Sequence, residues 1–279
     1  MVRSEDTIIG TSETSSSNNE VVVTGAGSLW SNSITVLMGS LSPGNRLIVS
    51  NGATSCANSF IVGFTNTSLN NRIIVDGGML IATNPGSGGL LDLRRGTNVF
   101  NSGLIEVDRL LVTNMPSFFE FSGGTLITKS TTNNIGRAFN VGNGVSAATL
   151  SLAGNGVHNF FAVGLMIRSN ASLIGNGTIH GPVTVQNGGT LAPGASIGKL
   201  MLINSIILQG STIMEIRKRG QLSLMINCES SAPLPSAARS PSRTSVRPHW
   251  VQEINSRSLA PAVTSTRLLP SYCRRLAQA

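Results

Sequence analysis

The hydrophobic and polar positions in the first 216 residues alternate with the two-residue period of β-strands, in short runs. Leu150 and Leu152 flank Ser151, and residues 183–185 repeat this order as Val, Thr and Val, so the central polar residue of each run is expected to face outward. The runs end in glycine or asparagine, which adopt left-handed backbone conformations easily and therefore suit tight turns. Helical periodicity is absent from this region. The pattern predicts short strands joined by turns.

Three segments share one order of residue types: asparagine, a charged residue, three aliphatic residues, and then polar residues and glycine. They are Asn19–Gly25, Asn45–Gly52 and Asn71–Gly78, and their asparagines lie 26 residues apart. Companion strands are predicted between them, around Ile34–Met38 and Phe60–Phe64, so that one period contains two strands. Self-similarity of this length is typical of one coil of a solenoid.

Four later segments use the same residue types with looser spacing. They are Phe121–Leu126, Leu150–Gly156, Leu173–Thr178 and Val185–Leu191. Such short strands cannot bury a core alone, whereas coils stacked in a parallel β-helix enclose a narrow interior of small aliphatic residues, with asparagine ladders at the corners and little need for aromatic residues. We therefore predict an all-β, right-handed parallel β-helix. The alternative, a β-sandwich, favours longer strands and regularly spaced hairpins.

The composition of the chain changes near residue 217. Residues 217–279 hold ten of the 20 basic side chains but two of the 12 acidic ones, so this segment alone accounts for the net charge of +8. It also holds one of the 31 glycines and six of the 11 prolines. We predict a β-helix domain over residues 1–216 and a basic, Arg/Ser/Pro-rich tail over residues 217–279 that is disordered or poorly packed.

Two interpretations of this tail remain open. Translation in a shifted reading frame would produce so abrupt a change in residue usage, and the composition favours that interpretation. A genuine basic tail would instead bind polyanions through its arginines, among them Arg239, Arg243, Arg247 and Arg257. Because residues 1–216 carry equal numbers of basic and acidic groups, we expect no specific nucleic-acid partner for the β-helix domain.

Two stretches resemble the repeats of bacterial surface proteins. Ser15–Asn32 resembles the repeat of autotransporter-type and PEP-CTERM-associated proteins, and Gly188–Leu200 is similar to the proline-glycine motif of autotransporter passenger domains. The resemblance covers about residues 8–216. It implies a β-helix that is secreted or displayed on the outer-membrane surface, an unidentified surface or extracellular ligand, and no catalytic residues, because these repeats form a scaffold.

The chain departs from that family at both ends. Residues 1–20 contain no apolar core of signal-peptide length, and the apolar stretch Met201–Met214 is interrupted by polar residues, so we predict no export signal and no membrane span. The tail has no strand pattern for a translocator barrel. Ile8–Gly10 occupies the place that Val62–Gly63 has before Asn71, so the chain begins inside a repeat. We expect an incomplete gene product, truncated at its N-terminus.

One motif matches a catalytic pattern. Gly194–Gly198 fits the G-x-S-x-G nucleophile elbow of hydrolases, with Ser196 as the nucleophile. That elbow requires a strand that runs into a helix, together with an oriented histidine. A proline precedes the motif and a strand is predicted over Leu200–Ile203, so we interpret the motif as a turn. The histidines show no partner pattern; they are His158, His180 and His249.

Polysaccharide lyases and hydrolases also use parallel β-helices, and they need acidic residues grouped on one face. The candidates are Asp76, Asp92, Glu106 and Asp108. Their separations of 16, 14 and 2 residues do not match the 26-residue coil, so we predict that they do not stack on one face. We expect solvated carboxylates, with Asp108 and Arg109 on an exposed strand face.

The remaining candidates predict no site. Trp30 could stack on a sugar, but a lone tryptophan is more often part of the core. The N-x-S/T matches at Asn66, Asn170 and Asn176 receive no role, and the cysteines, Cys56, Cys228 and Cys273, lack metal-ligand spacing. We predict no catalytic residue, metal or cofactor, and a non-catalytic scaffold for surface display or adhesion. A β-helix polysaccharide lyase or hydrolase and polyanion binding through the tail are the alternatives.

Overall fold

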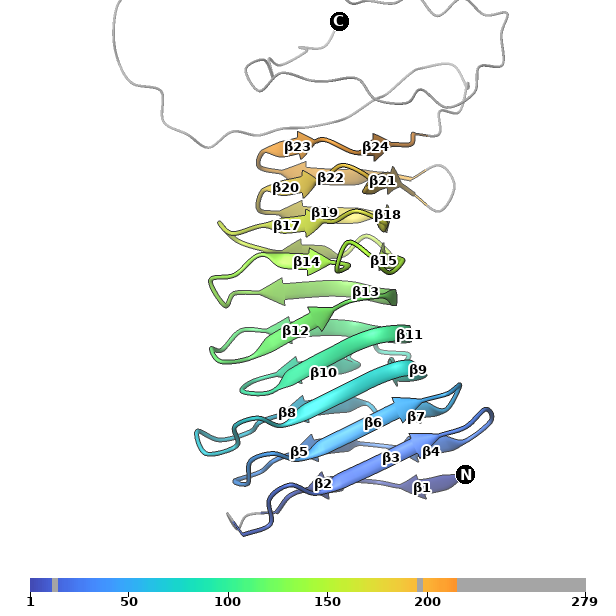
Figure 1. Ribbon diagram of the computed structural model, residues 1–279, viewed down its shortest axis with the longest axis vertical. Helices are drawn as coiled ribbons and strands as arrows, with labels where there is room; N and C mark the ends of the chain where they lie inside the picture. Colours follow the sequence, from blue (N-terminus) through green and yellow to red (C-terminus); the bar gives the residue numbers. More distant parts are fainter. Residues whose placement is uncertain (12–14, 195–197, 215–279) are drawn as a thin grey trace, which may run out of the picture.

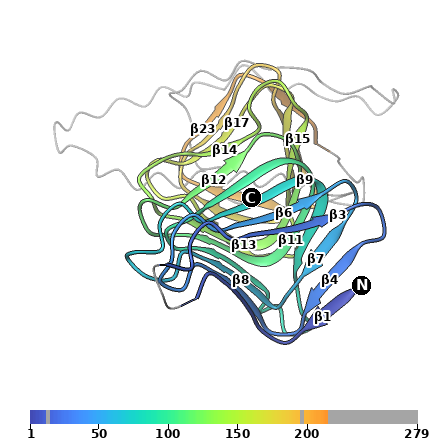
Figure 2. The ribbon, with the colours of Figure 1, turned by 60° about the horizontal axis from the view of Figure 1, so that its bottom comes forward.

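The computed structural model describes residues 1–11, 15–194 and 198–214, which form 24 β-strands and no helix. The chain winds through about nine turns, and each turn adds strands to three faces of one column (Figures 1 and 2). The predicted all-β parallel β-solenoid is therefore confirmed over these residues. The predicted tail, residues 217–279, lies outside them.

We number the three faces by the strands that stack along them. The first face contains β3 (Glu20–Thr24), β6 (Arg46–Ser50), the start of β9 (Arg72–Ala82), the start of β11 (Thr97–Val112) and β12 (Phe118–Phe121), and then the separate sheet of β14 (Phe139–Val141), β17 (Leu165–Ile167), β20 (Val183–Val185) and β23 (Ile206–Leu208). The second face contains β1 (Val2–Ser4), β4 (Leu29–Asn32), β7 (Thr54–Cys56), later parts of β9 and β11, the start of β13 (Gly124–Asn133), β15 (Ala148–Leu152), β18 (Ala171–Gly175), β21 (Thr190–Pro193) and β24 (Ser211–Thr212). The third face contains β2 (Thr7–Ile9), β5 (Thr35–Met38), β8 (Ser59–Val62), β10 (Leu90–Leu93), the ends of β11 and β13, β16 (Val157–Asn159), β19 (Gly177–His180) and β22 (Leu200–Ile203).

The predicted repeat sets the register of the first three coils. Val21 pairs with Leu47, and Leu47 pairs with Ile73, in parallel strands of consecutive coils. Every pairing between named strands in the described residues is parallel, which excludes the hairpins of a β-sandwich. Leu47 and Ile73 are fully buried, because alternate residues of each strand point into the column.

Each coil has three strands rather than the two that the sequence predicts. The missed strands of the first two complete coils are β4 and β7, which read Leu-Trp-Ser-Asn and Thr-Ser-Cys. In such a short strand only one or two side chains point inward. The inward side chains include the polar Asn32 of β4 and Ser55 of β7, so neither strand contains an aliphatic run. Backbone pairing with neighbouring coils, rather than local propensity, makes them strands.

The coils shorten toward the C-terminal end. Asn45 and Asn71 are 26 residues apart, whereas the paired residues Ser172 and Thr190 are 18 apart. The corner turns absorb this difference while the strands stay in register. Shorter turns explain why the later repeats are recognisable in residue type but not in spacing.

A stack of aromatic rings lies in the middle of the column, within a core that is otherwise mainly aliphatic, as expected. Phe100, Phe121, Phe119, Phe139 and Phe160 are buried, and successive rings in this order have centroids 5.1, 6.0, 5.5 and 5.5 Å apart. Parallel strands of adjacent coils lie about 4.8 Å apart, so rings of adjacent coils stack or tilt onto one another at a favourable distance, and β12 contributes two of them, Phe119 and Phe121. Five of the 12 aromatic residues of the chain therefore form one interior stack.

An asparagine ladder holds the corner before the first face, as predicted. The backbone N–H and side-chain Nδ2 of Asn19 donate to Oδ1 of Asn45 at 3.0 and 2.8 Å, and the same groups of Asn45 donate to Oδ1 of Asn71 at 2.9 and 2.9 Å. Asn45 and Asn71 are fully buried. Gly96 takes this position in the following coil, where a Cβ would lie 2.2 Å from a methyl carbon of Val62. The ladder therefore spans three coils.

Candidate functional site

The four acidic candidates do not converge on one face. Asp76 is exposed on the first face, where its Oδ1 accepts a hydrogen bond of 3.0 Å from the hydroxyl of Ser102. Glu106 lies on the second face opposite Ile127. Asp92 lies on the third face opposite Leu111, and Asp108 lies at the corner between the second and third faces. Their positions therefore agree with the prediction that the four acidic residues do not stack on one face.

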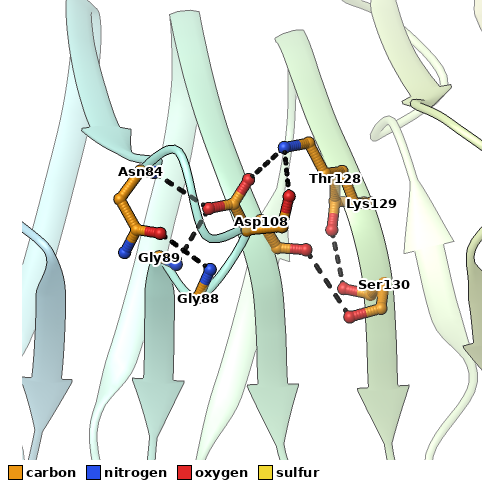
Figure 3. A network of polar contacts seen from close by, with 8 residues as sticks. Asn84, Gly88, Gly89, Asp108, Thr128, Lys129 and Ser130 are labelled. Carbon is orange, nitrogen blue, oxygen red and sulfur yellow. Dashed lines mark hydrogen bonds and ion pairs between the residues drawn. The ribbon is translucent and has the colours of Figure 1, made fainter.

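The expectation that Asp108 is solvated is wrong, because its side chain has no exposed surface. Its Oδ1 lies 2.7 Å from Nζ of Lys129, and its Oδ2 accepts hydrogen bonds from the backbone N–H groups of Asn84 (3.0 Å) and Gly89 (2.8 Å) (Figure 3). The loop 83–89 folds over the carboxylate and excludes water. Its neighbour Arg109 is exposed, as predicted.

The loop around Asp108 is fixed by its own contacts. Oδ1 of Asn84 accepts a hydrogen bond of 3.0 Å from the N–H of Gly88, and Nζ of Lys129 donates to the hydroxyl of Ser87 at 3.0 Å (Figure 3). A side chain at Gly89 would place its Cβ 2.0 Å from the carbonyl oxygen of Ala82. The loop therefore needs glycine to bring a backbone N–H against the carboxylate.

The protonation of Asp108 follows from these contacts. Burial raises the pKa of its carboxyl, but the hydrogen bonds from Lys129 and from the backbone of Asn84 and Gly89, together with the charge of Lys129, outweigh burial and hold the pKa below its usual value. An ionised carboxylate whose oxygens are both engaged is neither a proton donor nor a free base. Its surroundings suit a structural role.

Asp92 also departs from the predicted solvated state. Its side chain is 8% exposed, and its Oδ2 lies 2.7 Å from Nε of Arg94, two residues along the chain. The guanidinium of Arg94 lies 4.8 Å from the ring centroid of Phe64. The pair is thus held against the corner that follows β8 and β10.

The two described histidines do not form a catalytic pair. His158 is fully buried beneath the third face, with Nδ1 3.2 Å from the hydroxyl of Thr131, and burial lowers its pKa to about 4. It is therefore neutral near pH 7. Its register partner on β19 is Ile179, while His180 follows on the outward side. His249 lies outside the described residues.

The G-x-S-x-G motif has no elbow context. Gly194 follows the end of β21 and forms an antiparallel bridge with Gly175, and β22 begins at Leu200, as predicted, in place of the helix that an elbow requires. Ser196 lies outside the described residues.

The remaining candidates are the tryptophan Trp30, the asparagines of the N-x-S/T matches, and the cysteines. Trp30 is 8% exposed and belongs to the core, as predicted. Asn170 has a φ of 58° and donates from Nδ2 to the carbonyl oxygens of Gly144 (3.3 Å) and Val145 (3.2 Å), so it closes a corner. The remaining glycosylation-type matches and cysteines are placed as follows: Asn66 is exposed, Oδ1 of Asn176 is buried, Cys56 is a half-buried free thiol, and Cys228 and Cys273 lie outside the described residues.

The second face carries a feature that the sequence did not reveal. Hydroxyl residues occupy one outward position in five consecutive coils, which we call the hydroxyl column; they are Thr125, Thr149, Ser172, Thr190 and Ser211. Buried leucines next to four of them point inward, so these hydroxyls point outward. The unequal lengths of the coils conceal the column in the sequence, since its members follow no fixed spacing.

Within the described ranges, no three His, Cys, Asp or Glu side chains are grouped so that they could hold a metal ion. The same residues contain no helix that could cross a membrane. Comparisons with models of known families, with curated proteins and with solved structures found no match.

Proposed function

We propose that this solenoid is a non-catalytic scaffold for surface display or adhesion. The observation that carries the proposal is the state of Asp108, the most buried of the acidic candidates: both carboxylate oxygens bind groups that fasten a loop to the column. Buried Asn45 and Asn71 likewise bind neighbouring coils. Two of the four acidic candidates, Asp92 and Asp108, are thus engaged in buried ion pairs of the column.

The hydroxyl column is the surface that we propose meets the ligand. Hydroxyl groups both donate and accept hydrogen bonds, and here they recur about every 4.8 Å along the column. A repeating ligand such as a polysaccharide would meet the same group in each coil. The resemblance to autotransporter passengers supports a secreted or outer-membrane location, where such a ligand is available.

Binding to immobilised pectin, alginate and hyaluronan tests this proposal with the full chain. Replacing Thr149 and Thr190 together by valine keeps side-chain shape and removes two hydroxyls, so we expect binding to at least one polysaccharide to weaken about tenfold. Thr184→Val, which removes an outward hydroxyl from the first face, is the matched control and should leave binding unchanged. Equal binding by the double variant and the original chain would contradict the assignment of this surface.

A further inference from the structure

The corner between the third and first faces forms one long edge of the column, at the left in Figure 1. We call its middle part the corner edge; it consists of the loops 63–71, 94–96, 113–117, 134–138 and 160–164, which belong to five consecutive coils. The strands that lead into these loops pair in parallel from coil to coil. The loops therefore follow one another at about 4.8 Å and span roughly 20 Å.

Large nonpolar side chains are exposed along this corner edge. They are Phe64, Leu69, Met115, Phe161 and Val163, which are 40–69% exposed. Phe64 and Phe161 are also the only exposed phenylalanines among the described residues. Turns usually hold glycine, asparagine, aspartate or serine, so nonpolar side chains grouped on the turns of one edge indicate an interaction surface.

The loop that carries Phe64 and Leu69 is fixed to the preceding coil. The hydroxyls of Thr65 and Ser68 donate to the carbonyl oxygen of Ser40 at 2.9 and 2.8 Å. The N–H of Ser68 donates to the carbonyl oxygen of Thr65 at 3.1 Å. The two nonpolar side chains are therefore presented by a loop with a defined conformation.

The loop that carries Phe161 and Val163 is a single tight turn. The N–H of Gly164 donates to the carbonyl oxygen of Phe160 at 3.1 Å, which closes the turn. Phe161 has a φ of 49°, in the left-handed region that bulky residues rarely adopt. Backbone strain of this kind is concentrated at functional positions. Phe161 is thus held outward in a strained conformation, although its ring makes no part of the buried core.

The charged side chains of the corner edge are all positive. Its five loops contain three arginines, Arg94, Arg95 and Arg137, and no aspartate or glutamate. Arg94 is paired with Asp92 of the third face. Arg95 and Arg137 form no ion pair among the described residues. Because a guanidinium donates hydrogen bonds and accepts none, the surface that complements this edge is anionic.

We propose that the corner edge binds the surface of an anionic lipid bilayer. Its nonpolar side chains insert at the boundary between headgroups and acyl chains, and its arginines bind lipid phosphates. A straight row of side chains on successive coils matches a flat surface. In a column with three faces, this corner lies opposite the second face, so the hydroxyl column would point away from the bilayer.

Vesicle sedimentation with the full-length chain tests the insertion of nonpolar side chains. At about 0.15 M salt, we expect binding to vesicles of phosphatidylcholine mixed with phosphatidylglycerol and little binding to phosphatidylcholine alone. A Met115→Ser, Phe161→Asn double variant should bind about tenfold more weakly, since it removes two inserted side chains. Asparagine adopts positive φ readily, so the turn is preserved. Val145→Ser, which alters an 81% exposed side chain at another corner, is the matched control and should leave binding unchanged.

A second pair of variants tests the arginines. Arg137→Gln should weaken binding to the mixed vesicles about fivefold, because it removes a cation that contacts the charged surface. Arg109→Gln removes an exposed cation from the third face, at the far end of the strand from this edge, and should change binding by less than about twofold.

Hydrogen exchange measured by mass spectrometry locates the contact, because the basic residues 217–279 also attract anionic vesicles. Mixed vesicles should slow exchange in the loops 113–117 and 160–164 and leave residues 143–146 unchanged. Vesicle binding without this protection would assign the attraction to the tail and overturn the proposal.

Three further results would also overturn it. They are absence of binding to the mixed vesicles, equal binding by the original chain and the Met115→Ser, Phe161→Asn variant, and protection of both loops without vesicles as the protein concentration rises. The last result would assign the edge to a contact between protein molecules. These measurements are independent of the polysaccharide assays that test the scaffold function.

Discussion

Asn45 and Asn71 lie 26 residues apart in the sequence but one hydrogen bond apart in the structure, since the backbone N–H and Nδ2 of Asn45 both donate to Oδ1 of Asn71 at 2.9 Å. Oδ1 of Asn45 receives the same two bonds from Asn19. A single buried side chain therefore joins three consecutive coils. It also anchors its own turn, because Nδ2 donates to the carbonyl oxygen of Ser42 at 3.1 Å.

Replacing Asn45 by alanine is expected to destabilise the fold by about 2–4 kcal/mol, because it removes several hydrogen bonds and leaves buried partners unpaired. Chemical denaturation measures this loss. Asn101→Ala, at an exposed position of β11, is the control and should change the free energy of unfolding by no more than about 0.5 kcal/mol. A similar effect of both substitutions would show that the ladder contributes little to stability.

Asn98 is a polar residue in an apolar interior column, with Ile73 before it and Phe119 after it. It is fully buried, and neither its Nδ2 nor its Oδ1 has a hydrogen-bond partner among the described residues. Leucine has the same branched arrangement of side-chain heavy atoms as asparagine but no polar group, so we expect Asn98→Leu to stabilise the fold by about 1–2 kcal/mol. A raised denaturation midpoint with an unchanged m-value would support this prediction, and a lowered midpoint would contradict it.

His158 is expected to make the fold sensitive to acid. Its pKa is about 4 in the folded chain against an ordinary value of 6.5, so below pH 6.5 the unfolded chain takes up a proton that the folded chain does not. Stability from this group is complete above pH 6.5 and falls toward pH 4, by at most about 3 kcal/mol. His158→Gln should therefore lose less stability than the original chain between these pH values. Parallel stability curves for the two proteins would refute this explanation.

A substitution of Asp108, the partner of Lys129, tests whether the buried carboxylate holds the loop 83–89 in place. Asp108→Asn replaces one carboxylate oxygen by an NH₂ group. Either the backbone hydrogen bonds or the contact with Lys129 is then lost, and we expect the free energy of unfolding to fall by about 2–4 kcal/mol. Glu106→Gln, two residues earlier on the half-buried outward side, should cost at most about 0.5 kcal/mol. Hydrogen exchange at the amide of Gly89 provides a local measurement, because it should accelerate only in the Asp108 variant.

Sequence periodicity predicted the architecture well where each coil repeats its predecessor at constant length. Val21, Leu47 and Ile73 stack as the 26-residue spacing requires. The third strand of each coil was missed because β7 contains only Thr, Ser and Cys and becomes a strand through its neighbours. Pairing across coils joins residues that are far apart in the sequence, so the strand propensity of one segment does not reveal it.

The surroundings of the candidate residues were harder to predict. The spacing of the acidic residues does not match the coil and therefore predicts a solvated Asp108, but its partners come from another strand and a glycine loop, which that spacing does not reveal. The hydroxyl column was missed for a related reason, since Ser172 and Thr190 are separated by a different number of residues than Thr125 and Thr149. Because the turns differ in length from coil to coil, residues that stack in the structure are unevenly spaced in the sequence and give no periodic signal.

Turnover of polysaccharides by the full-length protein tests the proposed non-catalytic role most directly. Pectin, alginate and hyaluronan would be incubated with the protein near pH 7, with and without calcium, while new unsaturated and reducing ends are measured. Our account predicts no turnover above a blank without protein. Robust turnover that Glu106→Gln retains, and that a folded Asp108→Asn variant loses, would contradict it and assign Asp108 to catalysis.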